Sequence, residues 1–583
     1  MKPGDVSLRC AAALVDGLVR SGATLAAVSP GSRSTPLALA LARDRRISVH
    51  VHLDERSAAF FALGAAKATG APAVVACTSG TAAAELFPAV VEASQSRTPL
   101  VLLTADRPPD VRGTGANQTI DQRQLFGRYA RRYVEPPLPG SPSDADVWLD
   151  AGLDAGRAAT HRPAGPVQVD CPFPEDLTPT GDAAASPVST AEDRGGGVDA
   201  PPNDVIAGVR DFVETYGGRN GLIAIGGLPR PRTLSLLSLG TLLGWPVLAE
   251  PLSGLRLDAS DAGRALSAGQ FLIGDDGWLD GRRPDVVLQV GAAPTTRTTQ
   301  SLVGGTGALV VLDEMHLDPD PAHRAQRRIA RDPERFAAAA WDSRDEVAFR
   351  PPPGWLEGWR SADLVVRTAI DRALDRWDEP FEGRVARDVA SFLPHGATLV
   401  VGSSLPVRDL DAYMAPRRPP RIWNGADLLR VIGNRGASGI DGVVSTILGA
   451  AAGSASPTVG LIGDLSFLYD AGAVLWSSRV GVDAVLVVLS NGGGQIFSML
   501  DQVGLPEFDD LFLTPHPASI ARVCDAGSVP HTAVERAKDI NGAVERALRV
   551  GGVQVIEVVI DPERDRARRE ELRGVVHDVL RSH

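Results

Sequence analysis

The stretch that decides the fold is Val459-Gly-Leu-Ile-Gly-Asp-Leu-Ser466, followed along the chain by Val485-Leu-Val-Val-Leu-Ser-Asn-Gly-Gly-Gly494. Apolar runs predict buried strands over 458–462 and 484–489, and a helical pattern over 468–479 separates them. The strands run into Asp464 and Asn491. Because the carboxyl ends of parallel strands emerge at one edge of a sheet, where open α/β folds bind ligands, we expect Asp464 and Asn491 to meet there.

Asp464, Asn491 and the carbonyl groups of the glycine-rich turn are oxygen ligands of the kind that Mg²⁺ prefers beside a phosphate group. The glycines also allow the backbone to approach a diphosphate closely. An ordinary βαβ unit with an aspartate cap explains this stretch equally well when it is taken alone.

The rest of the chain repeats the alternation of strands and helices, which predicts doubly wound parallel sheets of the α/β class. Predicted strands fall into three groups, at 24–28, 47–52, 73–77, 100–104 and 167–170, at 221–225, 246–249, 285–290 and 308–312, and at 398–401, 421–424, 458–462, 484–489 and 553–559. We therefore predict three α/β domains, at 1–180, 204–345 and 361–583. Stretches rich in small residues and proline predict linkers at 181–203 and 346–360. The charged tail over 561–583 predicts a surface helix.

Bulk composition excludes several classes of function. The net charge of −12 over 583 residues argues against a nucleic-acid surface, which needs a basic stripe. The four cysteines have no metal-binding spacing and fit a reducing compartment. No apolar run reaches the roughly 20 residues of a membrane span, and no signal-peptide pattern is present at the start. We expect a cytoplasmic protein.

The opening stretch resembles the metal-diphosphate motif of thiamine-diphosphate enzymes, with Leu465 in place of a glycine and Ser490-Asn491 in place of paired asparagines. Such an enzyme also needs a buried carboxyl group, supplied by another domain, against the aminopyrimidine ring of the cofactor. Glu55 follows a predicted strand at the start of a helix and fits this role. An acidic residue that only complements a helix N-terminus is the plainer explanation of Glu55 alone.

A more specific resemblance rests on eight stretches in the first and third predicted domains. They are Ser29-Pro-Gly-Ser-Arg-Ser-Thr-Pro36, Asp54-Glu-Arg56, Thr78-Ser-Gly-Thr81, Thr104-Ala-Asp-Arg-Pro108, Gly115-Ala-Asn-Gln-Thr-Ile120, Gly433-Asn-Arg-Gly-Ala-Ser-Gly-Ile-Asp441, Gly463-Asp-Leu-Ser466 and Gly493-Gly-Gln-Ile-Phe497. In order and spacing they resemble the 2-succinyl-5-enolpyruvyl-6-hydroxy-3-cyclohexene-1-carboxylate synthases of menaquinone biosynthesis. Leu465, a departure from thiamine-diphosphate enzymes at large, is what this family shows. The middle domain resembles the family only weakly.

The resemblance implies a thiamine-diphosphate-dependent carboligase. It would decarboxylate 2-oxoglutarate and add the resulting succinyl carbanion equivalent to isochorismate, releasing CO₂. Glu55 would activate the aminopyrimidine, and Asp464, Asn491 and Gly493 would bind Mg²⁺ or Mn²⁺. The other residues implied to bind the cofactor are Ile440, Gly463, Leu465, Ser466 and Ile496.

The implied substrates are dicarboxylates, which need fixed cations, and arginine binds carboxylate groups with two parallel hydrogen bonds. The residues implied to bind substrate are Ser32, Arg33, Arg107, Asn117, Gln118, Arg297, Ser404, Arg408 and Arg435, with Ile496, Phe497 and Leu500 as an apolar wall. For any one arginine, a surface salt bridge is an equally good explanation. His52 and His395 receive no catalytic role.

In the superfamily that the chain resembles, the cofactor lies between the first domain of one subunit and the third domain of another, which implies a homodimer or a dimer of dimers. Two alternatives remain. One is another thiamine-diphosphate 2-oxoacid decarboxylase or carboligase, which would need fewer pocket arginines. The other is a non-catalytic oligomer that binds a nucleotide or acyl-CoA, which would have no need of Glu55.

Overall fold

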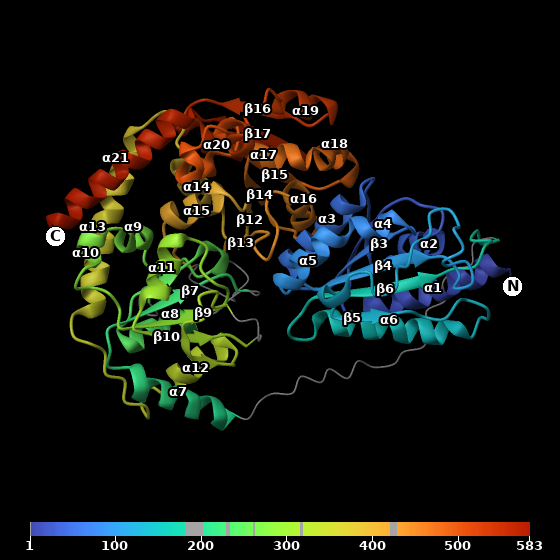
Figure 1. Ribbon diagram of the computed structural model, residues 1–583, viewed down its shortest axis with the longest axis horizontal. Helices are drawn as coiled ribbons and strands as arrows, with labels where there is room; N and C mark the ends of the chain where they lie inside the picture. The colour runs from blue at the N-terminus through green and yellow to red at the C-terminus, as the bar shows by residue number, and fades with distance from the viewer. Residues whose placement is uncertain (1, 181–201, 229–233, 260–262, 315–318, 420–427) are drawn as a thin grey trace.

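The computed structural model describes residues 2–180, 202–228, 234–259, 263–314, 319–419 and 428–583. Its strands form three sheets that follow one another along the chain, and in each sheet all the paired strands are parallel. Figure 1 shows the first sheet in blue and cyan, the second in green and the third in orange and red. The predicted α/β class with three doubly wound parallel sheets is confirmed.

The first sheet lies between two layers of helices. Its strands, in spatial order, are β2 (Ser48–Val51), β1 (Leu25–Val28), β3 (Ala73–Cys77), β4 (Leu100–Asp106), β6 (Pro166–Pro172) and β5 (Arg132–Val134). Its helices are α1 (Pro3–Arg20), α2 (Thr35–Arg43), α3 (Glu55–Thr69), α4 (Thr81–Glu85), α5 (Phe87–Gln95) and α6 (Asp144–Thr160). One apolar core packs α1, α2 and α6 on one face, and another packs α3 and α5 on the other.

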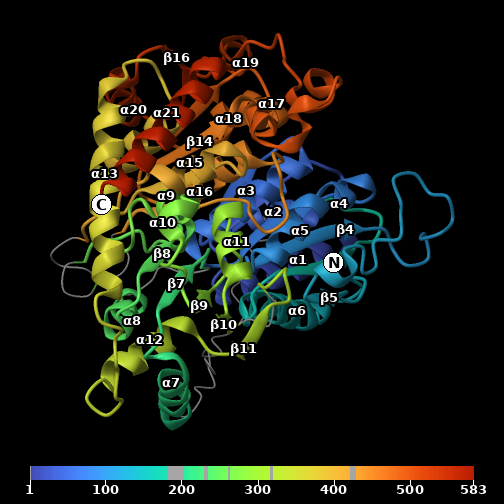
Figure 2. The same ribbon diagram turned by 60° about the vertical axis from the view of Figure 1, so that its left-hand side comes forward.

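The second sheet has the order β11 (Ala325–Ile329), β10 (Ala308–Leu312), β9 (Val286–Val290), β7 (Gly221–Ile225) and β8 (Val247–Ala249). Its helices are α7 (Pro202–Tyr216), α8 (Ser235–Leu243), α9 (Gly269–Gly274), α10 (Asp276–Leu279), α11 (Arg297–Gly305) and α12 (Pro333–Asp342). The core that includes α9 and α10 continues into two helices, α13 (Trp355–Arg376) and α21 (Pro562–Arg581), which lie side by side in Figure 2.

The third sheet has the order β13 (Arg430–Ile432), β12 (Thr398–Val401), β14 (Thr458–Gly463), β15 (Ala484–Ser490), β17 (Val553–Val559) and β16 (His531–Val534). Its helices are α14 (Glu382–Phe392), α15 (Leu405–Tyr413), α16 (Val443–Gly453), α17 (Asp464–Tyr469), α18 (Ala471–Val480), α19 (Ile520–Ala526) and α20 (Ile540–Val550). Short helical turns at 495–499, 501–504 and 509–513 follow β15.

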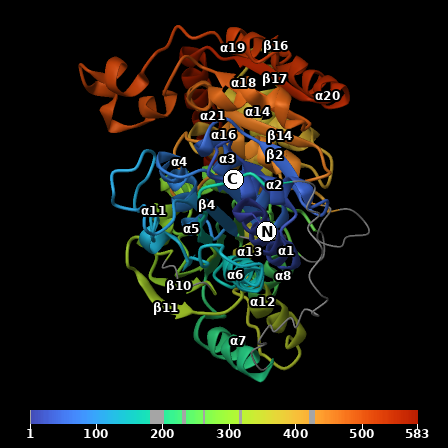
Figure 3. The ribbon, with the colours of Figure 1, turned by 90° about the vertical axis from the view of Figure 1, so that its right-hand side faces the viewer.

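Helices α3 and α16 join the first and third domains backbone to backbone (Figures 1 and 3). A Cβ atom on Gly64 would lie 2.1 Å from the carbonyl oxygen of Thr446, and one on Gly449 would lie 1.8 Å from that of Phe61. Only glycine permits such an approach. Because these helices share one apolar core, the first and third domains of a chain form one packed unit.

The strand predictions were incomplete at several edges of the sheets. Edge strands β5, β11 and β16 were not predicted. The predicted strand at 421–424 lies outside the described residues, and β13 occupies the corresponding edge at Arg430–Ile432. These strands are short and partly exposed, so they lack the continuous apolar run that marks a buried strand.

The structure also bears on the predicted linkers and tail. Residues 181–201 of the first predicted linker lie outside the described residues, and α13 begins at Trp355, within the second. The predicted tail helix is α21, whose Leu572, Val576 and Leu580 are buried against the neighbouring core, so only its other faces are exposed. Among the described residues, no helix combines the length and apolar character needed to cross a membrane.

Candidate active site

Asp464 is hydrogen-bonded to the turn that contains Asn491. Strands β14 and β15 are parallel neighbours, with Gly463 in register with Leu489, so their ends emerge together. Asp464 Oδ2 accepts hydrogen bonds from the backbone N–H groups of Asn491 (3.2 Å), Gly492 (2.8 Å) and Gly493 (3.1 Å). The expected meeting of the two strand ends is therefore observed.

Burial of the Asp464 side chain, which is 2% exposed, raises the pKa of its carboxyl group. The N–H of Leu465, His516 and the N–H of Gly492 act in the opposite direction. A buried carboxylate of this kind is stabilised by a nearby cation. The position therefore suits a ligand that carries positive charge.

The Asn491 side chain is oriented by Glu382, at the start of α14. Asn491 Nδ2 donates to Glu382 Oε1 at 2.6 Å, and Arg569 of α21 donates to Glu382 Oε2 at 3.1 Å. This directs Asn491 Oδ1 away from Glu382, and it lies 3.4 Å from the backbone nitrogen of Gly493. Burial, followed by repulsion from Asp565, raises the pKa of Glu382. Sequence reasoning missed Glu382, because nothing in its local sequence links it to a residue so far along the chain.

The donor set fits a divalent cation bound with a phosphate. It offers the carboxylate of Asp464, the amide oxygen of Asn491 and the backbone carbonyl of Gly493. The φ of Gly493 is 141°, which L side chains rarely adopt. A Cβ atom on Gly493 would also lie 2.3 Å from the carbonyl oxygen of Leu513. Among the described residues, no group of three or more His, Cys, Asp or Glu side chains could hold a metal. The proposed ligand set at Asp464 is of a different kind, because only one of its ligands is acidic.

The segment after β15 folds back over Asp464. The ring centroids of Phe497 and Phe512 are 5.8 Å apart, and His516 Nε2 lies 3.4 Å from Asp464 Oδ2. Ile496, Phe497 and Leu500, the predicted apolar wall, are all half-buried in this segment. His516 was not predicted, because it lies beyond the motif and approaches Asp464 only through this fold.

Glu55 is the first residue of α3. Asp54 caps the helix, its Oδ1 accepting hydrogen bonds from the N–H groups of Arg56 (2.8 Å) and Ser57 (3.2 Å). Burial raises the pKa of Glu55, the residue's own backbone N–H lowers it, and repulsion from Asp54 and Glu85 adds to the increase. Within one described chain, no hydrogen bond or ion pair joins Glu55 to Asp464 or Asn491.

Three of the predicted substrate arginines lie together near the boundary of the middle and third domains. Arg408 and Arg435 both donate to the carbonyl oxygen of Ser403, at 3.1 and 3.3 Å, and Arg408 also donates to that of Ser404 at 2.7 Å. Burial, and then repulsion from Arg435 and Arg297, lowers the pKa of Arg408, with Asp409 opposing. Within the described parts of the chain, none of the three arginines forms an ion pair with a carboxylate.

The other two predicted arginines form a separate group in the first domain. Arg33 is buried and donates to the carbonyl oxygens of Phe173 and Pro174, both at 3.1 Å, and to Glu175 at 2.9 Å. Arg107 lies 3.5 Å from the same carboxylate and donates to the carbonyl oxygen of Asn117 at 3.1 Å. This group is already neutralised in part by Glu175.

The remaining predicted residues are distributed over the same strand ends and loops. Ser32, Asn117 and Gln118 are exposed in the first domain, and the amide of Gln118 donates to the carbonyl oxygen of Ser79 at 3.1 Å. Ser404 immediately precedes α15, and Ile440 is half-buried in the loop between β13 and α16. Gly463 ends β14, and Leu465 and Ser466 lie in the first turn of α17.

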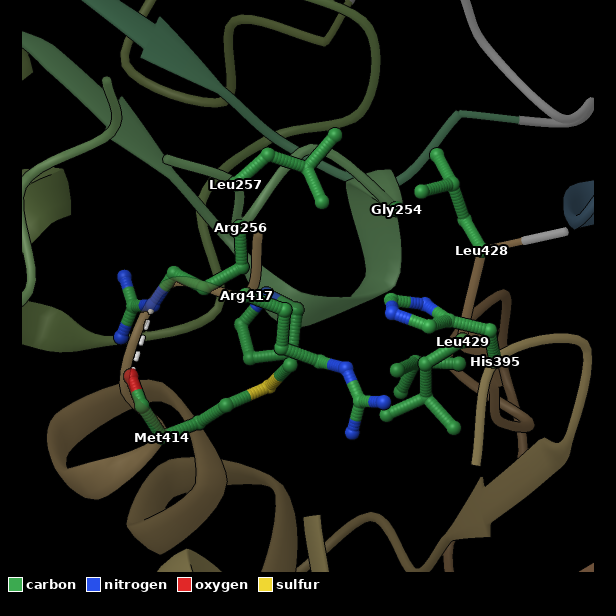
Figure 4. Close-up of a pocket in the computed structure, with 10 residues that line it drawn as sticks. Gly254, Arg256, Leu257, His395, Met414, Arg417, Leu428 and Leu429 are labelled. Carbon is green, nitrogen blue, oxygen red and sulfur yellow. Dashed lines mark hydrogen bonds between the residues drawn. The ribbon is translucent and has the colours of Figure 1, made fainter. Parts of the chain in front are cut away.

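A small cavity elsewhere along the boundary of the middle and third domains is not part of this group. Figure 4 shows it between the middle domain, with Gly254, Arg256 and Leu257, and the third domain, with His395 and Arg417. Its volume of about 10 Å³ has room for about one water molecule. None of its described lining residues was predicted to bind cofactor or substrate. His52 is also remote from a catalytic role, since it is buried against Phe61 with its pKa lowered to about 4 by burial.

Comparison with known families identifies two matching regions. Residues 8–125 match the family described as thiamine pyrophosphate enzyme, N-terminal TPP binding domain, and residues 417–558 match its C-terminal TPP binding domain. The first region contains Glu55, and the second contains Asp464 and Asn491.

Three curated relatives carry the name 2-succinyl-5-enolpyruvyl-6-hydroxy-3-cyclohexene-1-carboxylate synthase. The protein of Geobacillus thermodenitrificans is 39% identical over 94% of this chain and 92% of its own length. That of Chloroflexus aurantiacus is 39% identical, also over 94% of this chain and 92% of its own length. That of Thermobifida fusca is 38% identical over 98% of this chain and 99% of its own length.

Proposed function

Since this chain belongs to the 2-succinyl-5-enolpyruvyl-6-hydroxy-3-cyclohexene-1-carboxylate synthases, a family of thiamine-diphosphate enzymes, we propose the reaction that its site performs. The enzyme decarboxylates 2-oxoglutarate and joins the remaining four-carbon unit to isochorismate, as a carboligase of menaquinone biosynthesis. When bound, thiamine diphosphate supplies the carbon centre that accepts the oxoacid and stabilises the charge left by CO₂.

The observation that carries the substrate assignment is the group formed by Arg297, Arg408 and Arg435. Burial of Arg408 and repulsion from Arg435 and Arg297 make the charge of Arg408 costly, and a bound carboxylate offsets that cost. A dicarboxylate substrate supplies this charge, and a smaller monoacid supplies less of it. Arg33 and Arg107, with Ser32, Asn117, Gln118 and Ser404 as neutral donors, complete the proposed substrate site.

In the proposed cofactor site, Glu55 would hold a proton against a ring nitrogen of the aminopyrimidine, a role for which a raised pKa is suited. Asp464, Asn491 and the carbonyl of Gly493 would hold Mg²⁺ or Mn²⁺ with the diphosphate. Gly463, Leu465 and Ser466 would line the diphosphate site, and Ile440 would support the bent cofactor. Ile496, Phe497 and Leu500 would exclude water from the reacting atoms.

The proposed active unit is a homodimer, alone or within a dimer of dimers, located in the cytoplasm. Two observations support the dimer. Glu55 and Asp464 of one chain are not in direct contact, so a partner chain can complete each site. Leu53, two residues before Glu55, is 66% exposed, and Tyr469, whose ring lies against the guanidinium of Arg56, is 49% exposed. The four buried free cysteines are consistent with a reducing compartment.

The reaction is tested by measuring CO₂ release from 2-oxoglutarate, with thiamine diphosphate and Mg²⁺ present, in the presence and absence of isochorismate. We expect fast release only when isochorismate is present, with one adduct formed per CO₂. CO₂ release at the same rate with and without isochorismate would instead identify another 2-oxoacid decarboxylase. Cofactor binding without any release would favour a non-catalytic binding protein.

The arginine group is tested by Arg435→Ala. Arg435 is exposed, and its side chain donates one long hydrogen bond, 3.3 Å, to the carbonyl oxygen of Ser403, so its removal should leave the fold intact. We expect the KM of one dicarboxylate substrate to rise about 10- to 100-fold, because a hydrogen bond to a charged group contributes about 1.5–3 kcal/mol. Steady-state kinetics with each substrate varied in turn measures the change. Arg549→Ala, which removes an exposed arginine of the same domain, is the control and should leave both KM values unchanged.

A further inference from the structure

A buried ion pair from the first domain holds a loop of the third domain. Glu92 of α5 is 0% exposed, and its carboxylate accepts backbone N–H groups from Gly436 (3.1 Å), Ala437 (2.6 Å) and Ser438 (3.0 Å). Lys67 Nζ lies 2.7 Å from the same carboxylate. Although burial alone would raise the pKa of Glu92, Lys67 and the N–H groups of Ser438 and Ala437 lower it. The carboxylate is therefore charged and fully engaged with the loop.

Lys67 holds the beginning of the same loop. Its Nζ also donates to the carbonyl oxygen of Gly433 at 2.8 Å and to Asn434 Oδ1 at 3.1 Å. The loop is also fixed from its own domain, where Ser403 Oγ donates to the carbonyl oxygen of Asn434 at 2.6 Å. Gly433 to Ser438 is thus held between two domains.

The loop is seated directly on the end of α5. A Cβ atom on Gly436 would lie 2.8 Å from the backbone nitrogen of Ser96 and 3.0 Å from the carbonyl oxygen of Glu92. Any side chain at Gly436 would clash with α5 and displace the loop. The backbone between Gly433 and Ser438 therefore has little freedom while the ion pair is intact.

Arg435 lies inside the loop 433–438, which the Lys67–Glu92 pair (the clamp) holds, and Ile440 lies just beyond it. The Arg435 guanidinium reaches Ser403, beside Arg408, because the backbone on both sides of Arg435 is held. Displacement of this backbone would move a proposed substrate contact and a proposed cofactor contact together. Lys67 also lies in the last turn of α3, the helix that begins with Glu55.

We propose that Lys67 and Glu92 are positioning residues of the active site, which set the place of Arg435 and Ile440 without touching substrate or cofactor. This inference rests on the proposed function of Arg435. A misplacement of about 1 Å in a substrate contact can lower the rate about 100-fold, so loss of the clamp should appear in kinetics before the fold is lost. The clamp acts within one chain and does not depend on the subunit arrangement.

The test compares Glu92→Gln and Lys67→Met with the unaltered enzyme, loaded with thiamine diphosphate and Mg²⁺. We expect each variant to raise, by about 10- to 100-fold, the KM of the same substrate whose KM rises in Arg435→Ala. Lys67→Arg, which keeps the charge, should restore most of the loss. Faster hydrogen exchange of the 436–438 amides in Glu92→Gln would place the change in the loop.

The double variant Glu92→Gln/Arg435→Ala separates positioning from a general structural role. If Glu92 acts through Arg435, the second substitution should change that KM by less than about twofold, because the effects of coupled residues do not add. Additive effects, or a lowered thermal stability and kcat with unchanged KM, would overturn the proposal. If Arg435→Ala alone leaves both KM values unchanged, the substrate role of Arg435 fails, and the exchange measurement still tests the clamp.

Glu92→Asp tests the proposal even if Glu92→Gln does not fold. Glu92→Asp keeps the charge and draws the carboxylate back by one methylene group, so it should fold and still loosen the loop. We expect a KM increase of several-fold, about 3- to 10-fold, for the same substrate. A KM identical to that of the unaltered enzyme, with unaltered exchange of the loop amides, would contradict the positioning role.

Discussion

Replacement of Glu55 by glutamine is expected to lower turnover by about 100-fold or more while the protein still binds thiamine diphosphate. Glutamine keeps the size of the side chain and its place at the start of α3, where Asp54 caps the helix. It cannot share an acidic proton with a ring nitrogen of the cofactor. The loss should therefore fall on kcat, and the dissociation constant of the cofactor should change much less.

Two measurements check this expectation for Glu55→Gln. Stopped-flow kinetics under saturating substrate gives kcat, and calorimetric titration of thiamine diphosphate with Mg²⁺ gives the affinity. Glu214→Gln, an exposed residue of α7 in the middle domain, is the control and should keep normal turnover. Near-normal turnover in Glu55→Gln would reject the proposed role of Glu55 and favour the binding-protein alternative.

Asp464→Asn is expected to remove the effect of Mg²⁺ on cofactor affinity. The amide is the same size as the carboxylate but carries no charge, and its oxygen can accept fewer of the N–H groups of residues 491–493 that Asp464 now accepts. A divalent cation loses its one charged protein ligand in the proposed set. We expect the affinity for thiamine diphosphate to fall about 100-fold or more in the presence of Mg²⁺.

Calorimetry with and without Mg²⁺ measures this change without any need for turnover. The unaltered protein should bind thiamine diphosphate much more tightly with Mg²⁺, and Asp464→Asn should bind it weakly under both conditions. Asp525→Asn removes an exposed carboxylate of the same domain and should behave like the unaltered protein. If the metal still strengthens binding in Asp464→Asn, the ion is held elsewhere.

The central strands of all three sheets could be predicted because they are buried on both faces. Strands such as β7, β10 and β12 were predicted at the positions where they are found, since each is a continuous apolar run. Strand β11 was missed because its five residues include Gln326, Arg327 and Arg328. At the edge of a sheet, pairing with one neighbour stabilises a strand whose composition carries no signal of its own.

The same distinction holds for the candidate site. Asp464 and Asn491 could be brought together in advance, because parallel neighbouring strands end at one edge of the sheet. The contacts of Glu382 and of the Lys67–Glu92 pair could not be predicted, because they depend on how helices and domains pack. Glu92 is buried against residues 436–438 because this loop packs on the end of α5. No local sequence pattern predicts that contact.

The backbone contact between α3 and α16 has a consequence for how the cofactor could be exchanged. Since Gly64 and Gly449 leave no space between the helices, Glu55 and Asp464 of one chain travel on a single rigid unit. In a dimer whose cofactor bridges this unit and the unit of the partner, separation of the subunits opens both sites without deforming either chain. Dilution should then release cofactor, and saturation with cofactor should hold the subunits together, because a ligand favours the state that binds it.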